Sequence, residues 1–440
     1  MPARRLAALI LAAGRGTRMK SQRPKVLHEL GGRPMLAFPL EASRALGAER
    51  RLVVTGFGGD AVRERFEDEA DFVHQAEQRG TGHAVSLCRE PLGAFEGDVL
   101  ILYGDTPLLR GETLRRMVDL KAATRADLVL LSAPVDVPGI VVRDAAGGVA
   151  RIVEATDATP EELAIRERNT GVYLLDAALL WKLLDRVDDD NAQCEIYLTT
   201  IVELAVADGL RVEALALDDG EQAIGINTRA DLAVAADLLR RRTLNRLMAG
   251  GVTIVDPQAT WIDVGVEVGE DSVIEPGCVI QGETVIGARV HLRPGCTIEA
   301  SRIGDDVTIG PNAHLRPNCD VGNGVRIGNF VEVKNSVLGA GVKADHLTYI
   351  GDADVGAGAS FGCASVVVNY DGIAKHRTKV GERAFIGCNV NLVAPVEVED
   401  DAFVAAGSTI TARVPSEALG VARARQRNVE GWVARRRRRE

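Results

Sequence analysis

The chain has 440 residues, more than one hydrophobic core ordinarily supports, and its 46% hydrophobic and 26% charged residues are typical of a globular protein. No apolar run approaches the roughly 18 residues of a membrane-spanning helix, so we expect no membrane insertion. The net charge of −10 is unlike the basic balance of most nucleic-acid-binding proteins, so we expect no nucleic-acid partner.

The seven cysteines show no CxxC motif and no zinc-ligand spacing. This usage predicts reduced thiols and a cytoplasmic location. The first residues place two arginines before a short apolar run, as a signal peptide does. Because Gly14, Arg15 and further charges follow at once, a buried first strand is the better interpretation.

Residues 1–227 alternate short apolar runs with helical patterns. The runs that predict buried parallel strands lie at 6–11, 51–55, 98–103 and 127–132. The helical patterns lie at 37–46, 60–67, 81–90 and 111–121. This alternation predicts a doubly wound, Rossmann-like α/β domain.

A long helix is predicted over 228–249, where Gly250 and Gly251 should stop it, and it should connect to a second domain at 250–440. In this second part aliphatic residues recur every six positions from Ile262 to Ile410, with occasional steps of five. This is the hexapeptide repeat of a parallel β-helix. Three hexapeptides form one coil, so Cys278 and Cys296, 18 residues apart, are interpreted as stacked small residues.

Residues 368–379 interrupt this repeat, and insertions in a solenoid map to binding faces. Further polar residues break the pattern in separate coils. They include two cations, a histidine, a tyrosine and an amide: Arg316, Lys334, His346, Tyr349 and Asn335. Each could be a surface accident, but stacked coils can bring them into one cleft.

In the first domain, Gly14 and Gly16 follow the first predicted strand, and Arg18 and Lys25 come soon after. Glycine lets backbone N–H groups approach a phosphate, and the cations can neutralise a transferring phosphoryl group. The segment is neither a Walker A motif nor GxGxxG. A plain strand-to-helix turn with exposed basic residues is the alternative.

Asp105 follows another predicted strand, at the sheet edge where such folds bind ligands and Mg²⁺. The alternative for Asp105 is a helix N-cap. Between these segments, Gln75 and Gln78 precede Gly80 and Thr81. Their amides could read a base edge, or could cap the next helix.

Several runs of sequence together resemble one enzyme family closely. The runs LAAGRGTRM, QAEQRGTGHA, LYGDTPL and NAQCEIYLTT lie in the first half, and KADHLTYIGDADVG and VNYDG in the second. The chain resembles the bacterial bifunctional N-acetylglucosamine-1-phosphate uridylyltransferase/glucosamine-1-phosphate N-acetyltransferases over nearly its whole length. That resemblance implies a left-handed β-helix and a homotrimer formed through it.

For the first domain the resemblance implies uridylyl transfer from UTP, with Mg²⁺ held by Asp105 and Asn227. Arg18 and Lys25 would act in catalysis. The UTP phosphates would be bound by Gly14, Gly16, Arg18 and Lys25, and uracil by Gln75, Gln78, Gly80 and Thr81. The sugar would lie in a pocket formed by Tyr103, Glu154 and Asn169, and Leu11, Asp105 and Asn227 would complete the site.

For the β-helix the resemblance implies acetyl transfer from acetyl-CoA to glucosamine 1-phosphate, with His346 as the general base. Histidine suits this role because a free imidazole titrates near neutral pH. The substrate would be bound by Arg316, Lys334, Tyr349, Ser360, Asn369, Tyr370 and Lys375. The acetyl-CoA side would be formed by Cys363, Cys388, Ala406 and Arg423, with neighbouring chains contributing to one site.

The sequence departs from the family pattern at two places. Residues 138–143 replace a GYGRI run. Near the expected acetyl-CoA site the family has Asn, Gly-Ala-Gly and Ser. This chain has Ser360, Gly362-Cys363-Ala364 and Cys388 at those positions. One alternative is therefore a uridylyltransferase whose β-helix serves only for trimerisation; a non-enzymatic scaffold is another. The basic tail, Arg435–Arg439, is interpreted as a solvated end.

Overall fold

The computed structural model describes residues 4–191 and 193–438, so Arg439 of the predicted tail lies outside the described residues. Two compact units are present, Met1–Leu239 and Arg240–Glu440. The unit boundary falls inside helix α9, Arg229–Ala249, which matches the predicted 228–249 helix closely. None of the helices in the described part is long and apolar enough to cross a membrane.

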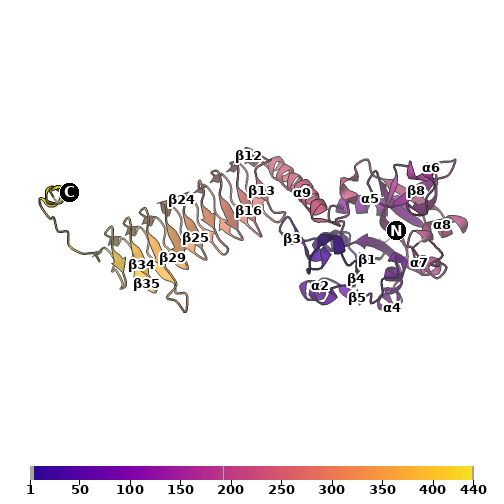
Figure 1. Ribbon diagram of the computed structural model, residues 1–440, viewed down its shortest axis with the longest axis horizontal. Coiled ribbons are helices and arrows are strands. Elements are labelled where there is room, and N and C mark those ends of the chain that lie inside the picture. Colours follow the sequence, from indigo (N-terminus) through magenta and orange to yellow (C-terminus); the bar gives the residue numbers. More distant parts are fainter. Residues whose placement is uncertain (1–3, 192, 439–440) are drawn as a thin grey trace. The chain divides into compact units, whose positions relative to one another are not determined.

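The first unit is built on one mixed nine-stranded sheet (Figure 1). The main path runs β11-β7-β10-β6-β1-β4-β5, and β8 and β9 extend it from β10. The strands are β1 Leu6–Ala12, β4 Arg50–Thr55, β5 Asp71–His74, β6 Asp98–Tyr103, β7 Leu128–Ala133, β8 Gly139–Arg143, β9 Val149–Glu154, β10 Arg168–Asp176 and β11 Val212–Ala216. Strands β5, β4, β1 and β6 pair in parallel, which follows from their apolar, doubly covered sequences.

Helices cover both faces of this sheet, which confirms the doubly wound class. One apolar cluster joins the sheet to α1 (Ala37–Ala45), α2 (Gly59–Phe66) and α5 (Gly111–Thr124). The cluster on the other face includes α3 (Thr81–Ser86), α4 (Arg89–Leu92), α7 (Ala177–Leu184) and α8 (Thr200–Ala207). The remaining short elements are β2 Glu29–Leu30, β3 Arg33–Pro34, α6 Pro160–Leu163, η1 Thr17–Met19, η2 Lys25–Leu27 and η3 Gly220–Ala223.

One local expectation was wrong. The helix predicted at 81–90 is two short helices, because Cys88 N donates to Val85 O at 2.9 Å and tightens the turn between them. The four strands predicted to be parallel do run parallel to one another, and β10, which was not predicted, lies antiparallel between β6 and β7. Strand β10 arrives after the β8–β9 hairpin rather than after a crossover helix, and a hairpin returns the chain in the opposite direction.

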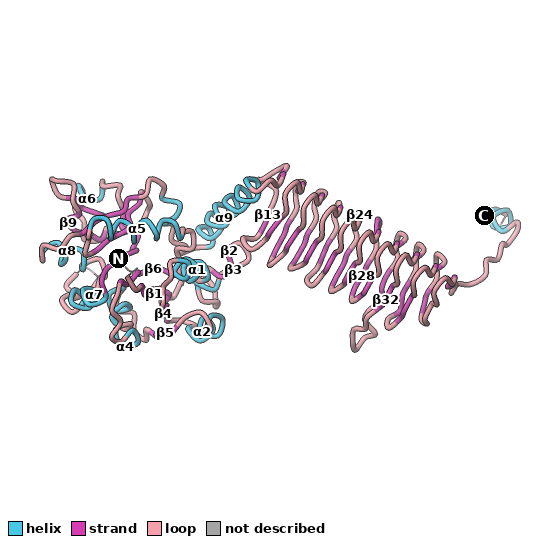
Figure 2. The backbone as a smooth tube through the Cα atoms, turned by 180° about the vertical axis from the view of Figure 1, so that it is seen from behind, coloured by secondary structure: helices cyan, strands magenta, loops and turns pink. Residues whose placement is uncertain are grey.

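The second unit is a parallel β-helix, as the six-residue period predicts. Its short strands form three flat faces (Figure 2): face 1 runs from β12 (Thr253–Ile254) to β38 (Leu419–Gly420), face 2 from β13 (Trp261–Ile262) to β37 (Thr409–Ile410), and face 3 from β14 (Glu267–Val268) to β35 (Val396–Val398). Ile274 pairs with Leu292, 18 residues on, and Leu292 with Ile309, where the repeat shortens by one. Cys278 and Cys296 are buried in the stack, which confirms their structural interpretation.

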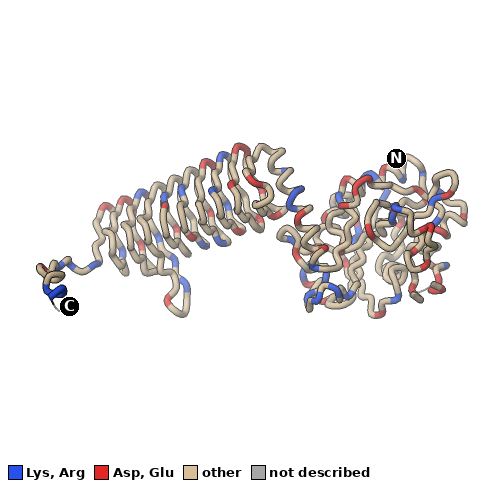
Figure 3. The backbone as a smooth tube through the Cα atoms, turned by 45° about the horizontal axis from the view of Figure 1, so that its top comes forward, with Lys and Arg blue, Asp and Glu red and all other residues tan. Residues whose placement is uncertain are grey.

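The insertion at 368–379 leaves the stack between β31 (Val366–Val368) and β32 (Thr378–Val380), and it protrudes from the coils as the orange loop in Figure 1. Across it Phe361 pairs with Ile386, so the coil closes despite the added residues. At the C-terminus, α10 (Trp432–Arg437) is basic, seen as the blue end in Figure 3.

The interior of the β-helix makes a stability prediction. Ile350 in β28 (Tyr349–Gly351) is fully buried, so Ile350→Ala removes packed methylenes and should lower the free energy of unfolding by about 2–5 kcal/mol. Ile373 in the insertion is 94% exposed, so Ile373→Ala should change it by less than about 0.5 kcal/mol. Denaturant titrations followed by circular dichroism test this, and equal effects of the two changes would contradict the buried stack.

Candidate active sites

A cavity of about 290 Å³ opens at the carboxyl ends of β1 and β6. These two strands pair in parallel with Leu11 opposite Tyr103, so the residues that follow them meet at one edge of the sheet. The cavity is lined by Leu11, Ala12, Ala13, Gly14, Lys25, Val26, Gln75, Gln78, Gly80, Thr81, Ala84, Tyr103, Asp105 and Glu195. Most residues predicted to bind nucleotide are therefore brought together.

Lys25 is the centre of charge at this cavity. Its side chain is only 10% exposed, and its Nζ contacts the Asp105 carboxylate and donates to Asn227 Oδ1 at 3.1 Å. Asp105 thus pairs with Lys25, and no helix begins at Asp105, so the alternative of an N-cap is wrong. The carboxylate and the amide oxygen converge on one position that a cation already occupies.

Two glutamine amides also line the cavity. Gln75 Nε2 donates to Gly80 O at 3.3 Å, and Gln78 Nε2 donates to Ala13 O at 2.9 Å. Neither glutamine caps the next helix, because Gly80 occupies the N-cap of α3 with no side-chain hydrogen bond. The alternative interpretation of these amides as caps is therefore wrong.

The glutamine loop is held by a segment far along the chain. Gly82 N donates to Ile196 O at 2.8 Å, and Leu198 N donates to Thr81 Oγ1 at 3.1 Å. This pairing brings Glu195 into the cavity wall. Sequence reasoning did not assign Glu195, although it stands in the NAQCEIYLTT run that resembles the family, and that position was the available signal.

Glycine occupies three positions of this site for different structural reasons. Gly16 has a φ of +60°, and a Cβ there would lie 2.8 Å from Lys25 Cβ. Gly80 has a φ of +103°, and its Cβ would lie 2.6 Å from Ile196 O. Gly14 is exposed, and a Cβ there would meet no atom within 4 Å. Gly16 and Gly80 therefore permit the close packing of the site, whereas Gly14 leaves open space for a ligand.

Tyr103 links the cavity to the predicted sugar pocket. Burial raises the pKa of Tyr103, and the charges of Asp105 and Glu154 act in the same direction, so both carboxylates lie near its hydroxyl. Burial also raises the pKa of Glu154, while its hydrogen bond from Thr199 Oγ1 at 3.3 Å opposes the shift. Tyr103 needs room as well, because a Cβ on Gly171 would lie 2.4 Å from its ring.

Five predicted residues stand outside the cavity wall: Gly16, Arg18, Glu154, Asn169 and Asn227. Asn169 is buried, with its amide hydrogen-bonded to the Tyr173 hydroxyl at 2.7 Å and to Gly171 N at 3.2 Å. Asn227 reaches the site only through Lys25. Arg18 lies on η1 with its side chain exposed, and its charge acts on Asp231 instead.

A second group of predicted residues lies along one edge of the β-helix. His346 ends β27 (Lys343–His346) and stacks on Asn329. The next coils add Cys363, Cys388 and Ala406 in the same place, because Ala364 N donates to His346 O, Asn389 N to Cys363 O, and Gly407 N to Cys388 O. His346 and Cys388 are exposed on this edge and Cys363 is half-buried. Near the C-terminal end of this edge, the Arg423 side chain lies 3.9 Å from the position that a Cβ on Gly407 would take.

A cluster of cations occupies the adjoining face 2. Contact with the Lys375 ammonium lowers the pKa of Lys334, and partial desolvation and the nearby charge of Arg316 add to this effect. Like charges repel, so their assembly is favourable only where an anion compensates them. Lys375 lies in the insertion, where its backbone forms an antiparallel β-bridge with Tyr370. Ser360 lies in β30 (Ser360–Phe361) on face 1, where it pairs with Lys343 on the neighbouring strand.

Asp352 ties the cluster together and was not assigned from the sequence. Its carboxylate accepts from Asn335 Nδ2 at 2.5 Å and from Asn369 Nδ2. Burial alone would raise the pKa of Asp352, but these hydrogen bonds and the charges of Lys334 and Lys375 lower it overall. Asn369 also donates to the Tyr349 hydroxyl at 3.4 Å. Asp352 lies in the KADHLTYIGDADVG run, so its sequence signal was position alone.

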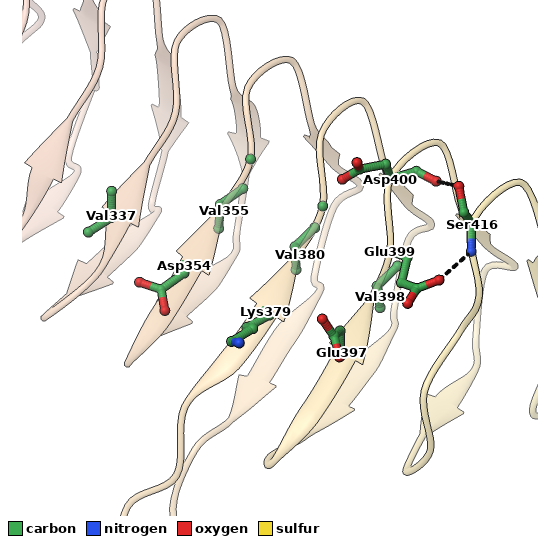
Figure 4. Close-up of a pocket in the computed structure, with 12 residues that line it drawn as sticks. Val337, Asp354, Val355, Lys379, Val380, Glu397, Val398, Glu399, Asp400 and Ser416 are labelled. Carbon is green, nitrogen blue, oxygen red and sulfur yellow. Dashed lines mark hydrogen bonds between the residues drawn. The ribbon is translucent and has the colours of Figure 1, made fainter.

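A larger hollow of about 540 Å³ lies on face 3 (Figure 4). Asp354, Lys379 and Glu397 stack across it on neighbouring strands, so charges alternate along its floor. Ser416 N donates to Glu399 at 2.8 Å at its rim. None of the residues predicted for either site lines this hollow.

Gly80 provides a test of the cavity wall. Gly80→Ala combines an unfavourable backbone conformation with a clash against Ile196 O, so we expect the free energy of unfolding to fall by roughly 1–3 kcal/mol. Gly14→Ala meets no atom and should stay within about 0.5 kcal/mol of wild type. Thermal and chemical unfolding of both variants measure the two free energies of unfolding. A larger loss of stability for Gly14→Ala than for Gly80→Ala would contradict the described cavity wall.

Comparison with known proteins gives the same two-part division. The model of the MobA-like NTP transferase domain matches residues 8–157, and the model of the bacterial transferase hexapeptide (six repeats) matches 265–300, 300–335 and 377–412. The chain is similar to the "Bifunctional protein GlmU" of Pelobacter propionicus, with 46% identity over 449 residues, covering 97% of this chain and 98% of that protein. It is 46% identical to the protein of that name from Trichlorobacter lovleyi over 453 residues, covering 98% of each. It is also 46% identical to the GlmU protein of a Geobacillus species over 447 residues, which cover 97% of each chain. The chain therefore belongs to the family of bifunctional GlmU proteins.

Proposed function

We propose that this chain makes UDP-N-acetylglucosamine in two steps. The β-helix transfers acetyl from acetyl-CoA to glucosamine 1-phosphate, and the first domain then transfers uridylyl from UTP to N-acetylglucosamine 1-phosphate. The observation that carries the proposal is the cavity at the ends of β1 and β6, where Lys25, Asp105 and the two glutamine amides converge. A non-enzymatic scaffold gives no reason for a nearly buried lysine at the mouth of a cavity.

Uridylyl transfer requires in-line attack of a sugar-phosphate oxygen on the α-phosphorus of UTP. The new P–O bond forms as the bond to pyrophosphate breaks, and no enzyme residue becomes covalently bound. Positioning and neutralisation of charge supply the catalysis. Lys25 supplies a cation at the cavity, the exposed backbone at Gly14 approaches phosphate, and the Tyr103–Glu154 region receives the sugar. Arg18 would have to turn toward the phosphates from its exposed position.

Mg²⁺ fits the oxygens of Asp105 and Asn227. The two groups already converge on the Lys25 ammonium, so the position suits positive charge. Magnesium takes one or two protein oxygens and completes its octahedron with water and phosphate oxygens, and among the described residues no cluster of three acidic, histidine or cysteine side chains competes for it. When bound, the ion would neutralise developing charge on the phosphates. Lys25 must then move from the pair toward a phosphate.

Acetyl transfer uses His346 as the general base. The imidazole removes a proton from the amine of glucosamine 1-phosphate, the nitrogen attacks the thioester carbon, and the C–S bond breaks to release CoA, whose sulfur regains a proton. Arg316, Lys334 and Lys375 would hold the sugar phosphate. The edge that continues to Cys363, Cys388 and Ala406 leads away from His346 in the direction an extended acetyl-CoA needs.

We also propose a homotrimer in which neighbouring β-helices complete each acetyl site. Within one chain His346 and Lys375 are exposed, and Lys334 and Arg316 are half-buried, on the surface of a thin prism. Such a surface offers little enclosure for a thioester, and a neighbouring chain supplies it. Hexapeptide repeats support assembly of this kind.

The uridylyl site is tested by Asp105→Asn. Loss of the carboxylate removes the partner of Lys25 and one proposed metal oxygen, so UDP-N-acetylglucosamine formation should fall by about 10²–10³-fold. CoA release from acetyl-CoA and glucosamine 1-phosphate should be unchanged, because Asp105 belongs to the other unit. Pyrophosphate and thiol assays measure the two reactions, and equal loss of both would indicate global damage instead.

The acetyl site is tested by His346→Ala. CoA release that depends on glucosamine 1-phosphate should fall by about 10²–10⁴-fold, while uridylyl transfer persists. The departures at Ser360, Cys363 and Cys388 favour the narrower alternative, in which the β-helix is only a scaffold. Sugar-dependent CoA release by the wild type excludes that alternative; absence of release, with UDP-N-acetylglucosamine still formed, would establish it.

A further inference from the structure

We infer that His83 is a positioning residue that sets which base the nucleotide site accepts, by fixing the orientation of the Gln75 amide. This inference rests on the proposed uridylyl transfer. Gln75 lines the cavity and is only 4% exposed, so its amide has few ways to satisfy its polar atoms. His83 stands on the first turn of α3, directly behind it.

The orientation of the Gln75 amide follows from its contacts. One end lies 3.3 Å from Gly80 O, and a carbonyl oxygen can only accept, so this end is the NH₂ group. The same nitrogen lies 3.2 Å from His83 Nδ1. Since the amide nitrogen donates there too, Nδ1 must be the unprotonated acceptor of a neutral imidazole that carries its hydrogen on Nε2.

Both amide hydrogens are therefore used inside the protein. Within the described part of the chain, no donor is seen to reach the Gln75 amide oxygen, and this oxygen is left to accept from whatever the cavity binds. Gln78 is exposed and donates only one amide hydrogen, to Ala13 O at 2.9 Å, so its orientation is less constrained. The Gln75 oxygen suits a base with an N–H at its pairing edge.

Uracil and cytosine differ at this edge. Uracil carries a hydrogen on N3, whereas N3 of cytosine is a lone-pair acceptor. An oxygen of Gln75 that lies against N3 accepts from uracil and opposes the lone pair of cytosine. The discrimination depends on this position, because the 4-amino group of cytosine is itself a donor. A site built for a hydrogen bond rejects the analogue that cannot form it, because a buried polar group is then left without a partner.

Gly80 O and His83 Nδ1 together make the reverse orientation unfavourable, because turning the amide over would place its oxygen against two acceptors. Without the imidazole only Gly80 O holds the amide. The amide hydrogen that His83 bound is then free to meet an acceptor in the cavity, such as N3 of cytosine. The position of His83 is itself fixed, because Gly82 N donates to Ile196 O at 2.8 Å and anchors the start of α3.

The test compares UTP and CTP as substrates with N-acetylglucosamine 1-phosphate, in the full-length wild type and two variants. His83→Phe keeps a flat ring but removes the acceptor, and the ratio of kcat/KM for UTP over CTP should fall at least about tenfold. His83→Asn places an amide oxygen near the position of Nδ1 and should keep the ratio within about threefold of wild type. His83→Leu replaces the Phe variant where circular dichroism shows that the latter is unfolded.

The outcomes separate the two claims. A wild type that turns over no UTP refutes the proposed function and this inference with it. A wild type that turns over UTP, with a variant lacking the acceptor that loses both substrates equally, overturns the role of His83 alone, since a merely structural residue would leave the ratio unchanged. A lowered ratio in His83→Phe that His83→Asn restores establishes the positioning role.

Discussion

The parallel pairing of β1 with β6 is the constraint on which the first site depends. It sets Leu11 opposite Tyr103, and each strand ends within a few residues of a group the chemistry needs, Gly14 after one and Asp105 after the other. At this point the sheet order reverses, because β4 leaves on one side of β1 and β6 on the other. No helix can cover the strand ends there, so the edge stays open for a ligand. The β-helix obeys the same logic, since in-register stacking turns residues far apart in sequence into one continuous edge.

Much of this arrangement could be predicted from the sequence, because both units repeat a simple pattern. Buried strands at the predicted places, the helix over 229–249 and the hexapeptide stack all follow from apolar spacing. The antiparallel strand β10 could not be predicted, since an apolar run does not reveal its direction. Glu195 and Asp352 were not assigned to a site from the sequence for another reason. Each reaches its site through backbone pairing or amide contacts that no local pattern encodes.

The departures from the family pattern fall on the β-helix edge rather than inside it. Cys363 and Cys388 stack one above the other on the same side as His346, and their neighbours keep the backbone ladder intact. The replacements therefore alter the surface that acetyl-CoA would touch without disturbing the core at Phe361 and Ile386. In the first domain, residues 138–143 form β8 in a paired hairpin, so the altered run retains a defined structure beside the predicted sugar pocket.

At both candidate sites the cations lie beside carboxylates. Lys25 contacts Asp105, Arg316 donates to Glu332 at 3.2 Å, and Asp352 lies within the field of Lys334 and Lys375. A phosphate entering either site must compete with these internal partners, which costs some affinity. In the first site Lys25 must leave Asp105, and Arg18 must turn inward, before either cation can neutralise charge that develops in the reaction. Discrimination then has to come from neutral groups such as the Gln75 amide, because a cation attracts every phosphate alike.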